Sequence, residues 1–264
     1  MTFWAVYGLA GLTILVLMTL LWLASLALKD SSIVDSFWGT GFVIAVWLGF
    51  ALMPGGYPAR KWLIALLVTV WGFRLSIHVL RRNRGHGEDF RYQAWRKEHG
   101  ERWWWRSFFQ VYLLQGLLMW FIAAPLIAAQ MATGPADLTG LDLLGVVVWG
   151  VGFFFEAVGD QQLARFRASP VNRGQVLKAG VWRYTRHPNY FGDAAQWWGY
   201  YLIALAAGAW ATVLSPVLMT FLLVRVSGVA LLEATLIDTK PGYQEYVETT
   251  SAFIPWFPRR PRQS

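Results

Sequence analysis

Long apolar runs divide the chain and set the limits on its fold. Several of them reach the roughly 20 residues that a helix needs to cross the hydrocarbon core of a bilayer. The 264 residues are 56% hydrophobic and only 14% charged, a composition too apolar for an ordinary soluble domain. We therefore predict an all-α, polytopic membrane protein with seven transmembrane helices, at residues 3–28, 34–53, 62–80, 107–130, 140–158, 190–207 and 209–232.

The basic residues indicate the orientation of these helices. With the N-terminus outside, nineteen of the twenty-three Lys and Arg residues lie in segments predicted to be cytoplasmic. Only Arg60 and Lys61 fall outside, while Arg74 and Arg225 lie within spans. Because cytoplasmic loops are enriched in Lys and Arg, we expect an outer N-terminus, a cytoplasmic C-terminus and an active site that faces the cytoplasm. Basic loops also account for the net charge of +8, so we expect no nucleic-acid partner.

Composition excludes some chemistry. The chain has no cysteine, which rules out disulfides, thiolate metal sites and cysteine nucleophiles. The histidines share no ligand spacing with one another or with carboxylates, so we expect no metal: they are His78, His86, His99 and His187. No repeat or flexible linker interrupts the chain, which predicts a single domain over 1–264. Near its end, residues 252–258 read Ala-Phe-Ile-Pro-Trp-Phe-Pro, an amphipathic segment expected to lie on the membrane.

The densest polar motif covers residues 180–193 and reads Gly-Val-Trp-Arg-Tyr-Thr-Arg-His-Pro-Asn-Tyr-Phe-Gly-Asp. Its Pro188 sits where a helix would begin, which aims free main-chain N–H groups toward an anion. Helical spacing puts Glu156, Asp160 and Arg167 on one face before the motif, and Asn189, Asp193 and Gln196 on another after it. Carboxylates and amides suit ribose hydroxyls and a carboxamide, whereas arginines suit phosphates.

This pattern favours a nucleotide pocket, with an interfacial belt of arginine and tryptophan that binds lipid headgroups as the alternative. The soluble nucleotide signatures G-x-G-x-x-G after a strand and the P-loop are both missing. Any nucleotide would therefore be held by a helical membrane fold.

Two charged residues stand out in the first half of the chain. Asp35 lies near the start of the second predicted span, and Arg74 lies within the third. Because an intramembrane charge is costly, each should pair or face a cavity. They could polarise a polar atom of a lipid-like substrate; alternatively, they form an interhelical salt bridge or extend to the interface. Arg225 and Glu233 form a weaker pair, expected to be structural.

Together these residues resemble the membrane reductases related to steroid 5α-reductase, in particular their bacterial relatives, the DUF1295 group. The resemblance is most specific over 156–256 and thinner over 30–110. The motifs that carry it are Asn83-Arg-Gly85, Glu156-x3-Asp160-x6-Arg167, Arg186-His-Pro-Asn-Tyr-Phe-Gly-Asp193 with Trp197-Trp-Gly199, and Tyr243-x-x-Tyr246 with Phe253-Ile-Pro255.

The resemblance implies seven helices around NADPH, with residues 140–256 mainly on the cofactor side and residues 1–131 mainly on the substrate side. It further implies hydride transfer to the conjugated C=C bond of a steroid- or isoprenoid-like enone, in a bacterial inner membrane. The expected catalytic residues are Asp35 and Arg74. The expected cofactor-binding residues are Asn83, Arg84, Asp160, Arg167, Arg183, Tyr184, Arg186, His187, Asn189, Tyr190, Asp193, Tyr243 and Tyr246. The expected substrate-binding residues are Trp38, Trp71, His78, Gln110 and Gln115.

Two departures from the family pattern bear on the substrate. Glu156 stands where the steroid enzymes have an asparagine, and Trp71 stands where they have the catalytic tyrosine. Polarisation of the carbonyl must then come from Asp35, Arg74 or another tyrosine.

Two alternatives stay open. Membrane methyltransferases of the isoprenylcysteine and phospholipid type use much of the same Arg-His-Pro-x-Tyr-x-Gly pattern to bind S-adenosylmethionine. The other alternative is a non-catalytic sterol- or lipid-binding protein. The many arginines favour NADPH, which carries three phosphate groups where S-adenosylmethionine carries none.

Overall fold

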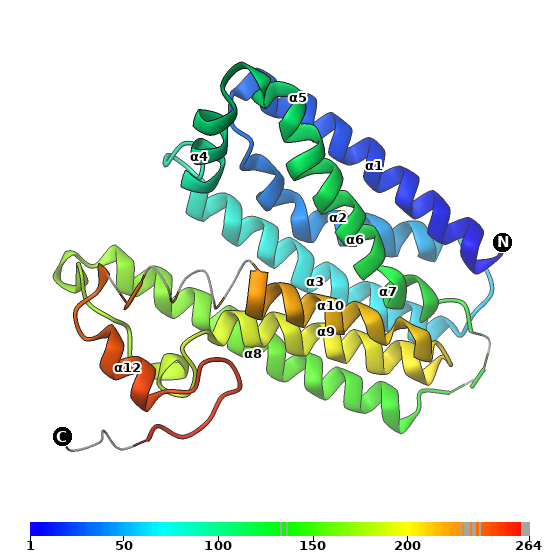
Figure 1. Cartoon of the computed structure of the whole chain (residues 1–264). Coiled ribbons are helices and arrows are strands. Elements are labelled where there is room, and N and C mark those ends of the chain that lie inside the picture. The colour runs from blue at the N-terminus through cyan, green and yellow to red at the C-terminus, as the bar shows by residue number, and fades with distance from the viewer. Residues whose placement is uncertain are drawn as a thin grey trace. The chain divides into compact units, whose positions relative to one another are not determined.

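The computed structural model describes residues 1–132, 134–135, 137–226, 229, 233, 236–237 and 239–259. Every regular element within these residues is a helix, which confirms the predicted all-α class (Figure 1). The longer helices are α1 (Phe3–Leu28), α2 (Ile33–Leu52), α3 (Pro58–Asn83), α8 (Gly140–Ala168) and α9 (Pro188–Ala206). Among the shorter ones, α4 (Phe90–His99) follows α3, and α12 (Tyr243–Thr249) lies near the C-terminus. Single 3-10 turns cover Gly100–Arg102, Pro170–Asn172 and Gly180–Arg183.

Four of the described helices are long and apolar enough to cross a membrane: α1, α2, α3 and α8. The exposed face of α3 shows why a bilayer suits them. Its large exposed apolar side chains recur every three or four residues and so form one outward stripe: Trp62, Leu66, Val70, Phe73, Ile77 and Leu80. A stripe of this kind is unfavourable in water but suits lipid chains. These helices fit an integral membrane protein.

The fourth predicted span is a series of short helices. It comprises α5 (Trp103–Ser107), a π-helical turn at Phe108–Leu113, α6 (Leu114–Ile122) and α7 (Ala124–Ala128). Pro125 explains the break between α6 and α7, because proline lacks an N–H donor and its ring clashes with the preceding turn.

The last three predicted spans agree with the observed helices to different degrees. Helix α8 continues ten residues past the predicted end at 158, and α9 lies within two residues of the predicted 190–207. The seventh span divides into a 3-10 turn (Trp210–Val213), α10 (Leu214–Phe221) and a π-helical turn (Leu222–Val226). The rest of that span, residues 227–232, lies mostly outside the described residues. The count of seven and the orientation therefore stay predictions.

The chain forms two compact units. The first contains Met1–Asp142 and Ile203–Ser215, and the second contains Leu143–Leu202 and Pro216–Ser264. In the first unit α2 and α3 cross so closely that a side chain on Gly39 would collide with the main-chain carbonyl of Gly72. The expectation of one functional domain over 1–264 stays a prediction.

Candidate functional site

In the second unit, α8 and α9 lie side by side (Figure 1), and glycines set their separation. A Cβ on Gly152 would lie 2.5 Å from the Gly192 carbonyl oxygen, and a Cβ on Gly199 would lie 2.7 Å from the Gly145 carbonyl oxygen. Small residues at these crossing points allow the two backbones to approach. Side chains one turn away from the glycines are thereby brought together across the two helices.

Two polar pairs bridge these helices. Gln196 Nε2 donates to Glu156 Oε2 (2.6 Å), and Asn189 Nδ2 donates to Asp160 Oδ1 (3.2 Å). Glu156 is only 2% exposed and Asp160 only 7%, so the amide partners offset a substantial cost of burying carboxylates. The two helix faces that the sequence predicted therefore meet. We call this row the polar seam: Glu156, Asp160, Asn189, Asp193 and Gln196.

Arg186, expected to hold a phosphate, makes internal contacts. Its guanidinium forms a two-point ion pair with Glu233, at 2.7 Å from Nε and 3.1 Å from Nη2. Its Nη1 donates to the main-chain carbonyls of Val247 (2.9 Å) and Thr250. Four of the five N–H donors of a guanidinium are thus directed at protein groups. The phosphate contact stays a prediction, and it would have to compete with these partners.

His187 shares the same carboxylate. Its Nε2 lies 3.0 Å from Glu233 Oε1, and its ring stacks on Tyr190 with the centroids 5.7 Å apart. Burial alone would raise the pKa of the Glu233 carboxyl above its ordinary value of 4.5, but hydrogen bonds from His187 and Arg186 outweigh burial and lower the pKa to about 2. The sequence suggested only a weak pairing of Glu233 with Arg225. The structure instead joins Glu233 to the motif.

A segment near the end of the chain is fixed against the same motif. We call residues 249–259 the C-terminal strap. Its main chain exchanges hydrogen bonds with residues of the motif: Arg186 N donates to Ser251 O (2.9 Å), and Trp256 N donates to Tyr184 O (2.9 Å). Just before the strap, the hydroxyl of Tyr246 donates to the main-chain carbonyl of Trp182. Tyr243 and Tyr246 are both buried, so these expected cofactor residues contribute to the packing under the strap.

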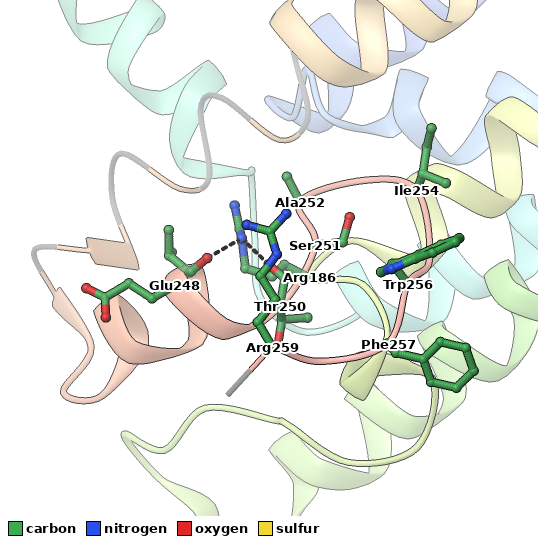
Figure 2. A pocket seen from close by; sticks show the side chains of 10 residues that line it. Arg186, Glu248, Thr250, Ser251, Ala252, Ile254, Trp256, Phe257 and Arg259 are labelled. Atoms are coloured by element: carbon green, nitrogen blue, oxygen red, sulfur yellow. Dashed lines mark hydrogen bonds between the residues drawn. The ribbon is translucent and has the colours of Figure 1, made fainter. Parts of the chain in front are cut away.

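Two cavities adjoin the strap. The first, of about 510 Å³, is lined by Arg186, Glu248, Thr250, Trp256, Phe257 and Arg259, among others (Figure 2). The second, of about 460 Å³, is lined by Lys178, Arg183 and Tyr246 together with strap residues. Arg183 and Arg167 are both exposed, and only Arg183 lines one of these two cavities. Lys178 forms an exposed ion pair with Glu245 at 2.7 Å.

In the first unit, Asp35 belongs to a hydrogen-bonded cluster that includes two residues of α4. Arg91 Nη2 donates to Asp35 Oδ2 (2.9 Å), and the hydroxyl of Tyr92 donates to Asp35 Oδ1 (2.7 Å). Gln115 Nε2 in turn donates to the Tyr92 hydroxyl (3.3 Å). Burial and the nearby Asp35 charge raise the pKa of the Tyr92 phenol, which keeps its proton. Asp35 is therefore a paired carboxylate, and Tyr92 is the proton-bearing group beside it.

The other substrate-side predictions are spread along α2, α3 and the π-helical turn. Trp71 is fully buried, and its ring packs 5.7 Å from Phe42, which in turn packs 5.4 Å from Trp38. This aromatic row indicates core packing for Trp71. Arg74 and His78 lie one turn apart on α3 and are both partly exposed.

The remaining residues of the first unit fall at or near helix ends. Gln110 lies in the π-helical turn and is partly exposed. Asn83 ends α3 and Arg84 follows it; both belong to the first unit, whereas the polar seam belongs to the second.

Three residues were missed as site residues by sequence reasoning: Tyr92, Arg91 and Glu233. The only signal for the first two was the mixed charge and aromatic content of the segment after α3. Among the described residues, no group of three or more His, Asp or Glu side chains could hold a metal ion.

Comparison with known proteins identifies the family to which the chain belongs. A family model described as a protein of unknown function, DUF1295, matches residues 21–250. The chain belongs to the DUF1295 family. This family is the steroid 5α-reductase-like group. An uncharacterised protein of Schizosaccharomyces pombe is 26% identical over 269 residues, which cover 91% of this chain and 77% of that protein. No solved structure matches.

Proposed function

We propose that this DUF1295 protein reduces the conjugated C=C bond of a steroid- or isoprenoid-like enone, with NADPH as the hydride donor. The observation that carries the proposal is the polar seam of the second unit. It pairs amides with carboxylates, and within the described structure the buried Gln196 Oε1 has no hydrogen-bond partner. A buried acceptor without a partner is costly; Gln196 itself is fully buried, so a nicotinamide carboxamide would reach the seam through the partly exposed Asn189 and Asp193. The association of the DUF1295 family with steroid reductase-like enzymes fits this proposal.

NADPH also fits the basic residues of the second unit. The seam would hold the carboxamide and ribose hydroxyls, and Arg167 and Arg183, both exposed, would hold phosphates. When bound, NADPH would supply the hydride. The contribution of the protein would be to position the reactants and keep water away from them.

In the first unit, Tyr92 is our candidate for the group that polarises the enone oxygen. The single O–H of Tyr92 is donated to Asp35 in this structure, so the hydroxyl would have to turn from Asp35 to the enone oxygen, while Arg91 keeps Asp35 paired. A positioned proton donor contributes about 100-fold or more to rate.

The first experiment is thermal unfolding in detergent with NADPH, NADH and S-adenosylmethionine side by side. A ligand at 100 times its Kd stabilises the folded state by about 2.7 kcal/mol, which is readily measured as a shift in Tm. Asn189→Ala should remove the NADPH shift. The matched control Asn172→Ala should retain it, because that side chain binds the Phe166 carbonyl at a distance of 3.0 Å and not the seam.

A second experiment tests the substrate side, with NADPH oxidation measured against a panel of lipid enones. Tyr92→Phe should lower kcat by about 100-fold and leave NADPH affinity unchanged. Tyr112→Phe is the control: its hydroxyl donates to the Ser31 carbonyl at 3.1 Å, so its loss should cost about 1 kcal/mol of stability and little turnover. Equal turnover in Tyr92→Phe and wild type would remove Tyr92 from the mechanism.

Methyl transfer from S-adenosylmethionine is the second candidate, because one observation favours it. Glu156, Asp160 and Asp193 make the seam acidic, which suits the sulfonium and ammonium charges of that cofactor. Arg186, which was expected to bind a phosphate, forms an ion pair with Glu233. Stabilisation by S-adenosylmethionine alone would replace the reductase assignment, and stabilisation by none of the three ligands would favour a lipid-binding protein.

A further inference from the structure

The C-terminal strap exposes large apolar side chains in the part of the second unit that follows the predicted spans. Ile254 is 66% exposed, Trp256 is 68% exposed and Phe257 is 74% exposed. Figure 2 shows these side chains extending from the loop that follows Thr250. A contiguous exposed apolar cluster in a folded protein marks an interaction site.

The strap is held in place by its main chain, so this exposure is built into the fold. Besides the two bonds to Tyr184 and Arg186, Thr185 Oγ1 donates to Phe253 O (2.9 Å), and Arg259 N donates to Thr249 O (2.8 Å). The Phe253 ring points inward and packs 6.1 Å from the Phe191 ring. The next residues are thereby directed outward. A surface that is already ordered loses little conformational entropy when it docks.

This surface carries both aromatic and basic side chains. Tyr184, 37% exposed, packs edge-on against Phe257 at 6.1 Å. Arg259 lines the cavity that Trp256 and Phe257 also line, and Arg183 lines the neighbouring cavity. Both arginines are exposed. We call this set the aromatic–basic patch: Arg183, Tyr184, Ile254, Trp256, Phe257 and Arg259.

We propose that the aromatic–basic patch docks on the anionic headgroup region of the bilayer that holds the protein. Tryptophan and tyrosine concentrate at membrane interfaces because an apolar ring and a polar edge suit both sides of that boundary. Arginines beside them match the negative surface of the cytoplasmic leaflet, the side predicted for the C-terminus. The docked strap would hold Ser251 and Thr250, and through them Arg186, in one arrangement. Arg183 is also a candidate phosphate ligand in the proposed function, so docking is tested without nucleotide.

A chain without cysteine allows a direct test. Trp256→Cys and Phe257→Cys would each carry an environment-sensitive fluorophore, in full-length protein at one chain per nanodisc. Gln244→Cys on α12 is the matched control, because it lies on the same unit and is exposed. The nanodiscs would contain phosphatidylcholine alone or with phosphatidylglycerol, and a small fraction of lipid with a quencher near the headgroup.

If the patch docks, fluorophores at positions 256 and 257 should emit at shorter wavelength and be quenched by the quencher-carrying lipid, whereas a fluorophore at position 244 should not. The quenching should be stronger when phosphatidylglycerol is present. The double substitution Arg183→Gln and Arg259→Gln should abolish the additional quenching caused by phosphatidylglycerol. It should leave the quenching in phosphatidylcholine alone unchanged. The proposal is overturned if all three positions are equally open to the aqueous quencher acrylamide. It is also overturned if 256 and 257 are protected only in detergent at high protein concentration, which would indicate contact with a second copy of the chain.

Discussion

Glu233 contacts two residues of the Arg186-His187-Pro188 motif from a position 46 residues beyond the histidine. Its ion pair with Arg186 is mostly buried, with 7% of the arginine side chain and 18% of the glutamate side chain exposed. Removing one partner of such a pair leaves the other charge buried without compensation. The carboxylate therefore matters for stability whichever cofactor the protein binds.

We expect Glu233→Gln to destabilise the protein by roughly 1.5–3 kcal/mol, the range for hydrogen bonds to charged groups, measured as a loss of Tm in detergent. Glu245→Gln is the control. It removes an ion pair of the same 2.7 Å length to Lys178, but on the surface, where such pairs contribute little. Equal effects of the two substitutions would contradict the role given to Glu233.

The same carboxylate predicts a dependence on pH. Because hydrogen bonds lower its folded pKa from 4.5 to about 2, its contribution is fully present above pH 4.5 and is lost as the pH falls toward 2. The Tm of wild type should therefore approach that of Glu233→Gln across this window. A constant difference between the two proteins from pH 6 to pH 3 would show that Glu233 is not the group that titrates.

Local periodicity explains which of these residues the sequence could predict. Asp160 and Asn189 were expected near one ligand because helical spacing placed each on a polar face, and the structure joins them. The Glu233 pairing has no such signal, since residues far apart in a chain meet only through tertiary packing. The same holds for Tyr92 and Asp35, whose hydrogen bond spans 57 positions.

Helices α8 and α9 carry the residues of the polar seam, and the glycines where they cross can be tested by substitution. Gly152→Ala would place its methyl group 2.5 Å from the Gly192 carbonyl oxygen, and Gly192→Ala would collide with the Gly152 carbonyl in turn. The helices would have to separate, which should destabilise the protein by about 1–3 kcal/mol and abolish the ligand-induced shift in Tm.

Gly150→Ala provides the control on the same helix. Nothing lies within 4 Å of a Cβ at that position, so the substitution should be neutral or stabilising by about 0.5–1 kcal/mol through helix propensity. If Gly152→Ala behaved like Gly150→Ala, the close crossing of α8 and α9 would be wrong.

Apolar runs predicted the helices well where one helix fills one run, as in α1, α2 and α9. They did not predict the π-helical turn at Phe108–Leu113 or the break before α7, because a run of apolar residues has the same hydropathy whether its helix is continuous or broken. The π-helical turn carries Tyr112, which binds the Ser31 carbonyl. Its role therefore depends on a contact with another element, which hydropathy does not report.

At the scale of the whole molecule, the two basic residues predicted to lie on the outer side of the membrane are buried. Arg60 pairs with Asp142 at 2.8 Å and is fully buried, and Lys61 donates to the main-chain carbonyls of Phe50 (3.1 Å) and Met53. Both charges are thus satisfied by protein groups of the first unit. This arrangement accounts for the two basic residues of the predicted outer loop, and the orientation itself stays a prediction.

We expect the N-terminus to lie outside and the C-terminal helix α12 to lie in the cytoplasm. Thr2→Cys and Gln244→Cys, introduced singly into the cysteine-free chain, would be labelled with a membrane-impermeant maleimide in sealed vesicles of known orientation. Right-side-out vesicles should label only position 2, and inverted vesicles only position 244. Labelling of both positions from one side would require an even number of membrane crossings between them. That result would contradict the seven-span prediction, and it would leave the contacts of the polar seam, which lie within the second unit, unaffected.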